Sequence, residues 1–80
     1  MSARQRFVGI DVATAQLDIA LRPTGERWAL ANDDFGIAAL VERLQAVQPH
    51  LIVLDATGGY QRAVVAALAA AGLSVAVGNP

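Results

Sequence analysis

The stretch FVGIDVATAQLDIAL, from Phe7 to Leu21, contains the pattern that decides the fold of this 80-residue chain. From Phe7 to Val12 nearly every residue is apolar, as in a strand that is covered on both faces of a sheet. After the short turn ATAQ, apolar Leu17, Ile19 and Leu21 alternate with other residues. A period of two predicts a strand with one exposed face, so we expect this stretch to form an antiparallel pair of strands.

The residues beyond this pair predict a third strand. Pro23-Thr24-Gly25 is a turn signal, because proline fixes its own φ and glycine accepts unusual values. Trp28 and Leu30 then share one face of an expected strand. Two tight connections between three strands indicate an antiparallel meander.

The second half of the chain predicts two helices, each followed by a strand. Asp33 or Asp34 can cap a helix that extends to about Gln48, where Pro49 ends it. Apolar residues recur along it at helical spacing: Ile37, Leu40, Val41, Leu44 and Val47. The expected elements beyond it are a strand, a helix ended by Gly72 and a last strand, over 50–54, 60–71 and 73–77. A helix between two strands implies a crossover, so these strands should run parallel to the first.

The composition suggests a chain that buries part of its apolar surface against something else. Of its 80 residues, 55% are hydrophobic and 16% are charged. A domain of this size buries only about 60% of its unfolded surface. We therefore expect either a fragment of a larger protein or a chain that self-associates. The formal net charge of −1 gives no electrostatic argument for nucleic-acid binding.

Other bulk features argue against several classes of protein. Without cysteine, the chain has no disulfide framework and no thiolate chemistry, which fits a cytoplasmic protein. The start MSARQRF is followed within a few residues by an aspartate and a polar turn, unlike a signal peptide. The longest apolar run, 63–77, is interrupted by Gly72 and Ser74 and is shorter than the ~18 to 20 residues of a membrane span.

Two aspartates stand near the carboxyl ends of expected parallel strands. Asp11 interrupts the first apolar strand, and Asp55 closes the fourth. If these strands are neighbours about 4.8 Å apart, both side chains emerge at the same edge of the sheet, where open sheets bind ligands. Carboxylates held that close repel each other unless a proton or a divalent cation lies between them, and Mg²⁺ or Mn²⁺ suits oxygen ligands. One histidine and no cysteine argue against zinc.

Other interpretations of these residues stay open at this point. Asp55 can bond to the amides of the following ATGG, and Asp11 can cap a turn. Asp18 lies on an alternating strand, where a solvated surface position is expected. The TGG of residues 57–59 can present amides to a phosphate, although a tight strand-to-helix turn is the simpler interpretation.

The order of elements resembles the ribonuclease H-like fold, whose strand order is 3-2-1-4-5. More narrowly, several blocks resemble, in register over nearly the whole chain, the N-terminal part of the DEDD transposases of the insertion-sequence 110 family. These blocks are VGIDVATAQLDIALRPTGERW, NDDFGIAALVERL, LIVLDATGGYQRAVVAALAAAGLSVAV and the closing NP. The resemblance implies an α/β fold with a ribonuclease H-like mixed sheet, in the order β-β-β-α-β-α-β and truncated before its C-terminal helix.

This resemblance implies half of a four-acid metal site. Members of the family have a RuvC-like N-terminal domain in which four acids, Asp-Glu-Asp-Asp, bind Mg²⁺. Asp11 matches the first acid, and Asp55 stands where the family's EATGGY-like block has glutamate, which is one methylene longer. The last two acids lie on a helix beyond the fifth strand, so the resemblance places them after Pro80. Residues 1–80 are then expected to be an N-terminal fragment of the catalytic domain.

The implied activity is that of a DNA transposase, with divalent-metal-dependent phosphodiester cleavage and strand transfer. The catalytic and metal-binding roles fall on Asp11 and Asp55, with Mg²⁺ or Mn²⁺ as cofactor. The implied partners are DNA, a structured RNA that selects DNA sites, and a separate C-terminal domain with a participating serine. We expect the 80 residues alone to be inactive, to bind metal weakly and to form a homo-oligomer, in the cytoplasm and with no membrane partner.

Two other functions are compatible with this fold. Actin-like ATPases and sugar kinases open with a similar hairpin, but they usually have glycine and hydroxyl residues after the first aspartate, so that amides can approach phosphate. Here the turn is Val12-Ala13-Thr14-Ala15, without glycine. The second alternative is a non-catalytic ribonuclease H-like module for assembly or nucleic-acid docking, and the Asp55 departure favours it.

Overall fold

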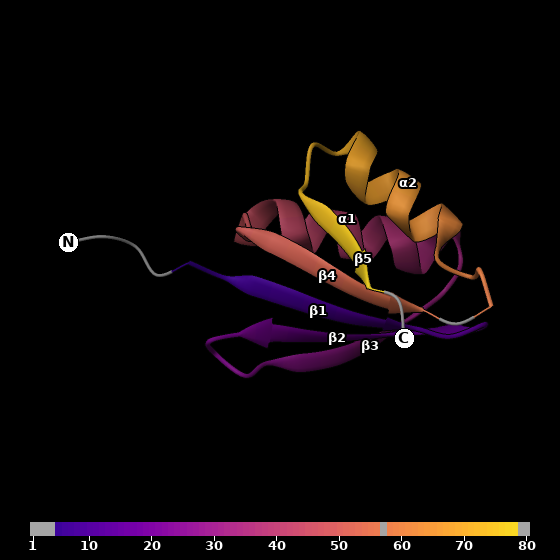
Figure 1. Ribbon diagram of the computed structural model, residues 1–80, viewed down its shortest axis with the longest axis horizontal. Coiled ribbons are helices and arrows are strands. Elements are labelled where there is room, and N and C mark those ends of the chain that lie inside the picture. Colours follow the sequence, from indigo (N-terminus) through magenta and orange to yellow (C-terminus); the bar gives the residue numbers. More distant parts are fainter. Residues whose placement is uncertain (1–4, 57, 79–80) are drawn as a thin grey trace.

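The computed structural model describes residues 5–56 and 58–78, and its elements follow the predicted order β-β-β-α-β-α-β (Figure 1). They are β1 (Phe7–Val12), β2 (Gln16–Arg22), β3 (Arg27–Ala31), α1 (Asp34–Val47), β4 (Leu51–Ala56), α2 (Arg62–Ala70) and β5 (Val75–Gly78). Helix α2 begins two residues later than predicted, because the turn before it is longer and includes two glycines with positive φ, Gly58 and Gly59.

The five strands form one sheet in the predicted order β3-β2-β1-β4-β5. Strand β1 lies at the centre, antiparallel to β2 and parallel to β4, and β5 continues parallel to β4. Helix α2 connects β4 to β5, and such a crossover returns the chain to the starting edge of the sheet. Because β1 and β4 are parallel neighbours, their carboxyl ends lie at the same edge.

Both helices pack on one face of the sheet (Figure 1). Alternate residues of the strands face the helices and are buried: Val8, Ile10, Val12, Leu17, Ile19, Leu21, Ile52 and Leu54. The helices complete this core with Ile37, Leu40 and Leu44 from α1 and with Val64 and Leu68 from α2. Alternation along a strand necessarily sends the intervening side chains to the other face.

That other face, called the open face below, differs from what the sequence suggested for β1. The apolar run predicted a strand covered on both faces, but the described residues cover only one. Phe7 and Asp11 of β1 and Val53 of β4 are exposed on the open face. Hydrophobicity alone therefore overstated how much of β1 the described residues cover.

Helix α1 begins and ends as its sequence indicates. Asp33 is the N-cap, and its carboxylate accepts a hydrogen bond from the backbone N–H of Gly36 over 2.8 Å. A Cβ at Gly36 would overlap the carbonyl oxygen of Ala31, so glycine allows the first turn of α1 to lie close to β3. At the other end Gln48 adopts the left-handed conformation, and Pro49 follows it.

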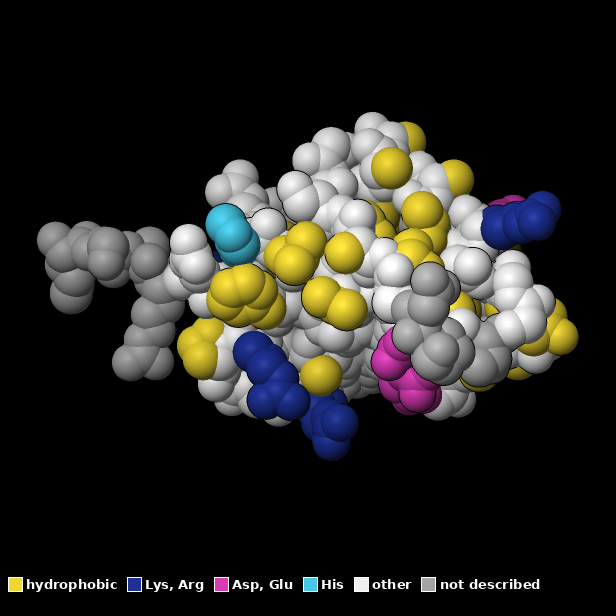
Figure 2. Space-filling view, viewed as in Figure 1, with side chains coloured by type: hydrophobic (Ala, Val, Ile, Leu, Met, Phe, Trp, Pro, Cys, Tyr) yellow, Lys and Arg dark blue, Asp and Glu magenta, His cyan; other side chains and the backbone are white. Residues whose placement is uncertain are grey.

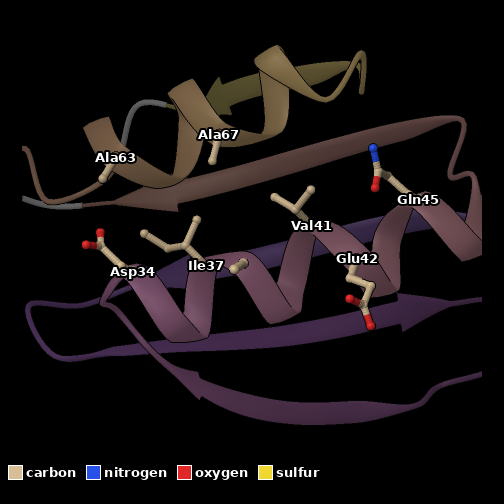
Figure 3. A pocket seen from close by; sticks show the side chains of 8 residues that line it. Asp34, Ile37, Val41, Glu42, Gln45, Ala63 and Ala67 are labelled. Atoms are coloured by element: carbon tan, nitrogen blue, oxygen red, sulfur yellow. The ribbon is translucent and has the colours of Figure 1, made fainter.

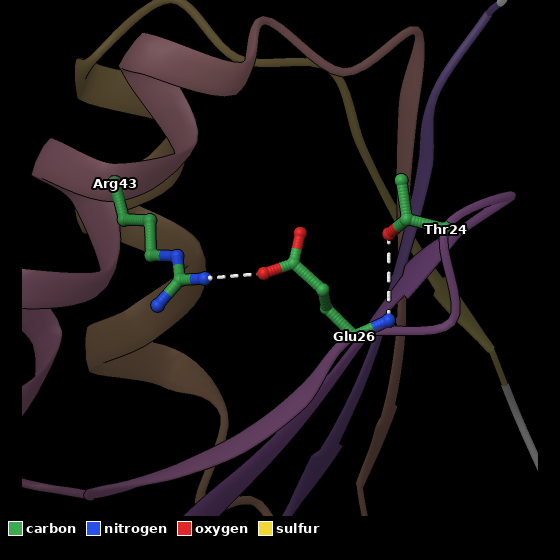
Figure 4. A network of polar contacts seen from close by, with 3 residues as sticks. All are labelled: Thr24, Glu26 and Arg43. Atoms are coloured by element: carbon green, nitrogen blue, oxygen red, sulfur yellow. Dashed lines mark hydrogen bonds and ion pairs between the residues drawn. The ribbon is translucent and has the colours of Figure 1, made fainter.

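Side-chain contacts fix the edge strand β3 to α1 (Figure 4). The Arg43 guanidinium lies 3.8 Å from the centre of the Trp28 ring and forms an ion pair with Glu26 at 3.1 Å. The backbone N–H of Glu26 donates to Thr24 Oγ1. Both side chains of the ion pair are about half exposed, so solvent screens their attraction. The contact between Arg43 and the Trp28 ring contributes about 0.5–1 kcal/mol to stability at such a position.

Candidate functional site

The carboxyl ends of β1 and β4 bring the two predicted acidic residues together. In the parallel register of these strands, Asp11 is the direct partner of Asp55. Direct partners on neighbouring strands are about 4.8 Å apart and project from the same face. Because Ile10 and Leu54 face the helices, Asp11 and Asp55 lie on the open face, and both are exposed there.

A third carboxylate, Asp18, joins this pair. Asp18 of β2 is the antiparallel partner of Asp11, so Asp18, Asp11 and Asp55 form one row across three adjacent strands, called the acidic row below. Asp18 is exposed as predicted, but its position beside Asp11 was missed. The sequence did contain a signal for this pairing. Asp11 and Asp18 are equally far from the middle of the turn at Thr14–Ala15, and a tight hairpin pairs residues at such positions.

Within the described residues, Asp18 is the only member of the acidic row whose side chain is hydrogen-bonded. Gln16 Nε2 donates to Asp18 Oδ1 over 2.8 Å. Among residues 5–56 and 58–78, no group donates a hydrogen bond to the side chain of Asp11 or Asp55. Turn capping by these two carboxylates therefore finds no support in this part of the chain, while Thr57 lies outside the described residues.

The open face is hollowed beside the acidic row. A groove of about 560 Å³ has Asp11 and Asp18 at one end, and its wall and floor are formed by Gly9, Ile19, Ala20, Arg27, Trp28 and Ala29. Small side chains occupy its middle, so an extended ligand can approach the sheet there.

On the other side of the row, Gly78 of β5 is the register partner of Asp55. A Cβ at Gly78 would lie only 3.2 Å from Asp55 Oδ1. That separation is tighter than ordinary van der Waals contact, so glycine at this position leaves space for the Asp55 carboxylate.

Basic side chains share the open face with the acidic row. Arg22 and Arg27 are exposed and lie toward the amino end of β1, as their pairing with Phe7 and Ala20 shows. Figure 2 shows basic side chains to the left of an acidic group, with hydrophobic side chains between and above them. The open face thus has opposite charges at its two ends.

A second groove, of about 530 Å³, lies between α1 and α2 on the covered side of the sheet (Figure 3). Its lining residues are Asp34, Ile37, Ala38, Val41, Glu42, Gln45, Ala63 and Ala67. The acids Asp34 and Glu42 are separated by about two turns of α1, so they do not converge on one ligand. This groove therefore offers no paired carboxylates.

The acidic row fits part of a site for a hard divalent ion. Carboxylate oxygens on adjacent strands are ligands that Mg²⁺ and Mn²⁺ prefer. Within the part of the chain that the structure describes, no group of three or more His, Cys, Asp and Glu side chains is arranged to hold a metal ion. Asp11 and Asp55 can thus supply two ligands, and water or other groups must supply the rest. His50 packs edge-on against Phe7 at the other end of β1, with ring centres 5.6 Å apart, and is no candidate ligand.

The sequence matches the family model of the insertion-sequence 110 DEDD transposases, described as a transposase, over residues 8–80. The chain belongs to this family. Comparison with curated proteins found no match. No described helix of this transposase-family chain has the length and apolar character needed to cross a membrane.

Two solved structures are similar to the transposase-family chain. RuvC from T. thermophilus, in complex with a Holliday junction substrate, superposes with a TM-score of 0.74 at 16% identity. The match covers 96% of this chain and 66% of the RuvC chain, so this chain spans just under two thirds of RuvC. A non-polymerising mutant of MamK bound to AMPPNP gives a TM-score of 0.57 at 10% identity, over 95% of this chain and 41% of MamK. These similarities confirm the ribonuclease H-like, RuvC-like fold.

Proposed function

We propose that this chain forms part of the catalytic domain of a DNA transposase, in which Asp11 and Asp55 bind Mg²⁺ or Mn²⁺ for phosphodiester cleavage and strand transfer. The observation that carries the proposal is the parallel register of Asp11 and Asp55 on the open face. The family match and the RuvC-like fold support the same assignment. Residues 1–80 would be the N-terminal part of that domain, since the similar RuvC chain is longer.

The acidic row would act by concentrating negative charge at one place. Asp11 would be the central ligand, because it has a carboxylate neighbour on each side. Asp55 would be the second ligand, and Asp18, already bonded to Gln16, would add potential that attracts a cation. A divalent ion in such a site supplies Lewis-acid activation of a water or hydroxyl nucleophile and stabilises the leaving oxygen.

Aspartate in place of the family's glutamate at position 55 brings the carboxylate closer to its own strand. The missing side chain of Gly78 leaves that shorter carboxylate free to turn toward β5 or toward Asp11. This freedom would let Asp55 bind a metal ion directly or through a water molecule.

The open face would carry the DNA. A nucleic-acid strand whose scissile phosphate lies at the acidic row could run along the groove, over Gly9 and Ala20, toward Arg27 and Arg22. Guanidinium groups bind phosphate oxygens in pairs of parallel hydrogen bonds. In this arrangement the arginines would bind phosphates next to the one that reacts, without reading base sequence.

The remaining proposals concern partners and the behaviour of the short chain. We propose a structured RNA and a second copy of the chain as partners. We also propose a cytoplasmic location, which is consistent with DNA substrates and with the lack of cysteine.

Residues 1–80 alone would be inactive and bind Mn²⁺ weakly, because two carboxylates leave most ligand positions to water. Micromolar or tighter Mn²⁺ binding by residues 1–80 in calorimetric titration would contradict this.

The test is strand cleavage by the intact transposase, meaning the complete protein that carries this sequence. Asp11→Asn should abolish cleavage and exchange in Mg²⁺ while the circular dichroism spectrum stays unchanged, because the neutral amide removes one of the negative charges that bind the cation. Glu42→Gln, an equivalent change at an exposed acid on α1, is the matched control and should keep full activity. Wild-type cleavage by Asp11→Asn would refute the assignment.

The similarity to MamK bound to AMPPNP raises nucleotide binding as a second candidate. Phosphate binding after β1 needs free amides in the turn, whereas the Ala13 N–H already donates to Gln16 O over 2.9 Å. The groove, the acidic row and the family match all favour the transposase function. Saturable ATP binding by the intact protein, lost in Asp11→Asn, would revive the nucleotide hypothesis.

A further inference from the structure

Asn32, between β3 and α1, connects three segments that are distant in sequence. Its side-chain Nδ2 donates to Ala13 O over 2.9 Å and to Tyr60 O over 3.3 Å. Its backbone N–H donates to Ala15 O over 3.0 Å. One residue therefore links the turn after β1, the junction after β3 and the turn after β4.

An amide side chain can make both side-chain bonds, whereas a carboxylate of the same shape cannot. The two acceptors are backbone carbonyl oxygens, and the NH₂ group of asparagine has two hydrogens to donate. An aspartate has nearly the same shape but no hydrogen to donate when ionised, so it would place charge against two carbonyl oxygens. The sequence has Asn at 32 and Asp at 33, where the cap needs an acceptor, so the two neighbours are not interchangeable.

The position of this link matters because the ladder between β1 and β4 ends beside it. The last register pair of these strands is Val12 with Ala56, one residue beyond Asp11 and Asp55. Beyond that pair, β1 and β4 are each followed by a separate turn. Among the described residues, the Asn32 side chain connects those turns directly, through Ala13 and Tyr60.

We propose that Asn32 is a positioning residue for the acidic row. By tying the two turns together, it holds the ends of β1 and β4 at a fixed separation and so fixes the distance between the Asp11 and Asp55 carboxylates. Asn32 does not touch the metal or the substrate in this proposal. The inference rests on the proposed metal site at Asp11 and Asp55.

The test compares three variants of the intact transposase. Asn32→Ala removes both side-chain bonds, and Asn32→Asp removes them while keeping the shape; both keep the backbone bond to Ala15. Gln45→Glu, on the exposed side of α1, controls for an amide-to-carboxylate change elsewhere. Hydrogen exchange at the backbone amides of residues 13–16 and 58–61 is measured without metal, and Mn²⁺ affinity is measured by titration.

In both Asn32 variants we expect the backbone amides of both turns to exchange faster by about fivefold to 150-fold, which is the range for the loss of two ordinary hydrogen bonds. We expect Mn²⁺ affinity to fall about tenfold in Asn32→Ala and in Asn32→Asp, with no change in Gln45→Glu. Tighter Mn²⁺ binding by Asn32→Asp would instead indicate a purely electrostatic effect and overturn the inference.

Two further results separate this inference from the function it rests on. If Asp11→Asn loses Mn²⁺ binding while Asn32→Ala keeps the wild-type affinity, Asn32 does not position the acids and the inference alone is wrong. If Asp11→Asn also binds Mn²⁺ like wild type, the proposed metal site itself is wrong. Faster exchange in one turn without the other would show that Asn32 does not couple them.

Discussion

Charge repulsion within the acidic row makes a quantitative prediction about stability. Asp11 has an acidic register partner on each side, whereas Asp18 and Asp55 each have only Asp11 beside them. In water, each pair of carboxylates about 6 Å apart repels by about 0.7 kcal/mol. Asp11→Asn removes two such pairs, so it should stabilise residues 1–80 by about 1.4 kcal/mol at low salt without metal. Asp18→Asn and Asp55→Asn should each give about half of this.

The assay is thermal unfolding followed by circular dichroism at low and physiological salt. For a domain of this size, the expected gain for Asp11→Asn corresponds to roughly 6 to 10 °C in Tm at low salt. At 0.15 M salt the Debye length is about 8 Å, so the gain should shrink to about half. Mn²⁺ should cancel this gain at ten times its Kd, where it stabilises wild type by about 1.4 kcal/mol. At a hundred times its Kd it contributes about 2.7 kcal/mol, so wild type should then be the more stable of the two.

Several outcomes would refute this reasoning. A metal-free Asp11→Asn variant less stable than wild type at low salt would mean that the Asp11 carboxylate stabilises the fold. Equal effects for all three aspartates would contradict the central position of Asp11. Glu42 lies on helix α1 and not in the acidic row, so Glu42→Gln should show no comparable salt-dependent gain in stability.

Three more perturbations test the neighbourhood of the row. Gly78→Val should weaken Mn²⁺ binding by the intact protein about fivefold, because the Cβ of the new valine crowds Asp55 Oδ1. The control is Ala76→Val at an exposed position of the same strand, and it should bind Mn²⁺ like wild type. Arg27→Ala should weaken DNA binding equally for all sequences and reduce the slope of log K against log salt by about 1; an unchanged slope in a salt titration would remove Arg27 from the DNA path. Leu54→Ala, at a fully buried position, should lower the free energy of unfolding by about 2–5 kcal/mol in denaturant titration, and a loss below 1 kcal/mol would contradict the described core.

Local rules in the sequence account for most of the elements. Helix α1 starts at an N-cap aspartate and ends before Pro49, because capping and proline geometry act within a few residues. The period of two in β2 predicts which side chains face the core, and the crossover rule predicts that β1 and β4 are parallel. These rules place Asp11 and Asp55 at the same edge once β1 and β4 are neighbours, and the family resemblance rather than a local rule implied that adjacency. The start of α2 was less predictable, since two glycines in a row allow turns of several lengths.

Periodicity, capping and chain direction thus determined the order of elements, the alternation of side chains along β2 and the edge at which Asp11 and Asp55 emerge. The tertiary structure decided which other residues share that edge. Asp18 stands beside Asp11 because of the hairpin register, and Asn32 reaches Ala13 and Tyr60 because α1 and the two turns meet in space. Both helices also pack on one face, which leaves the acidic row on the other. The physical reason is range: propensities act over a few residues, whereas register and the choice of face depend on contacts between segments far apart in the chain.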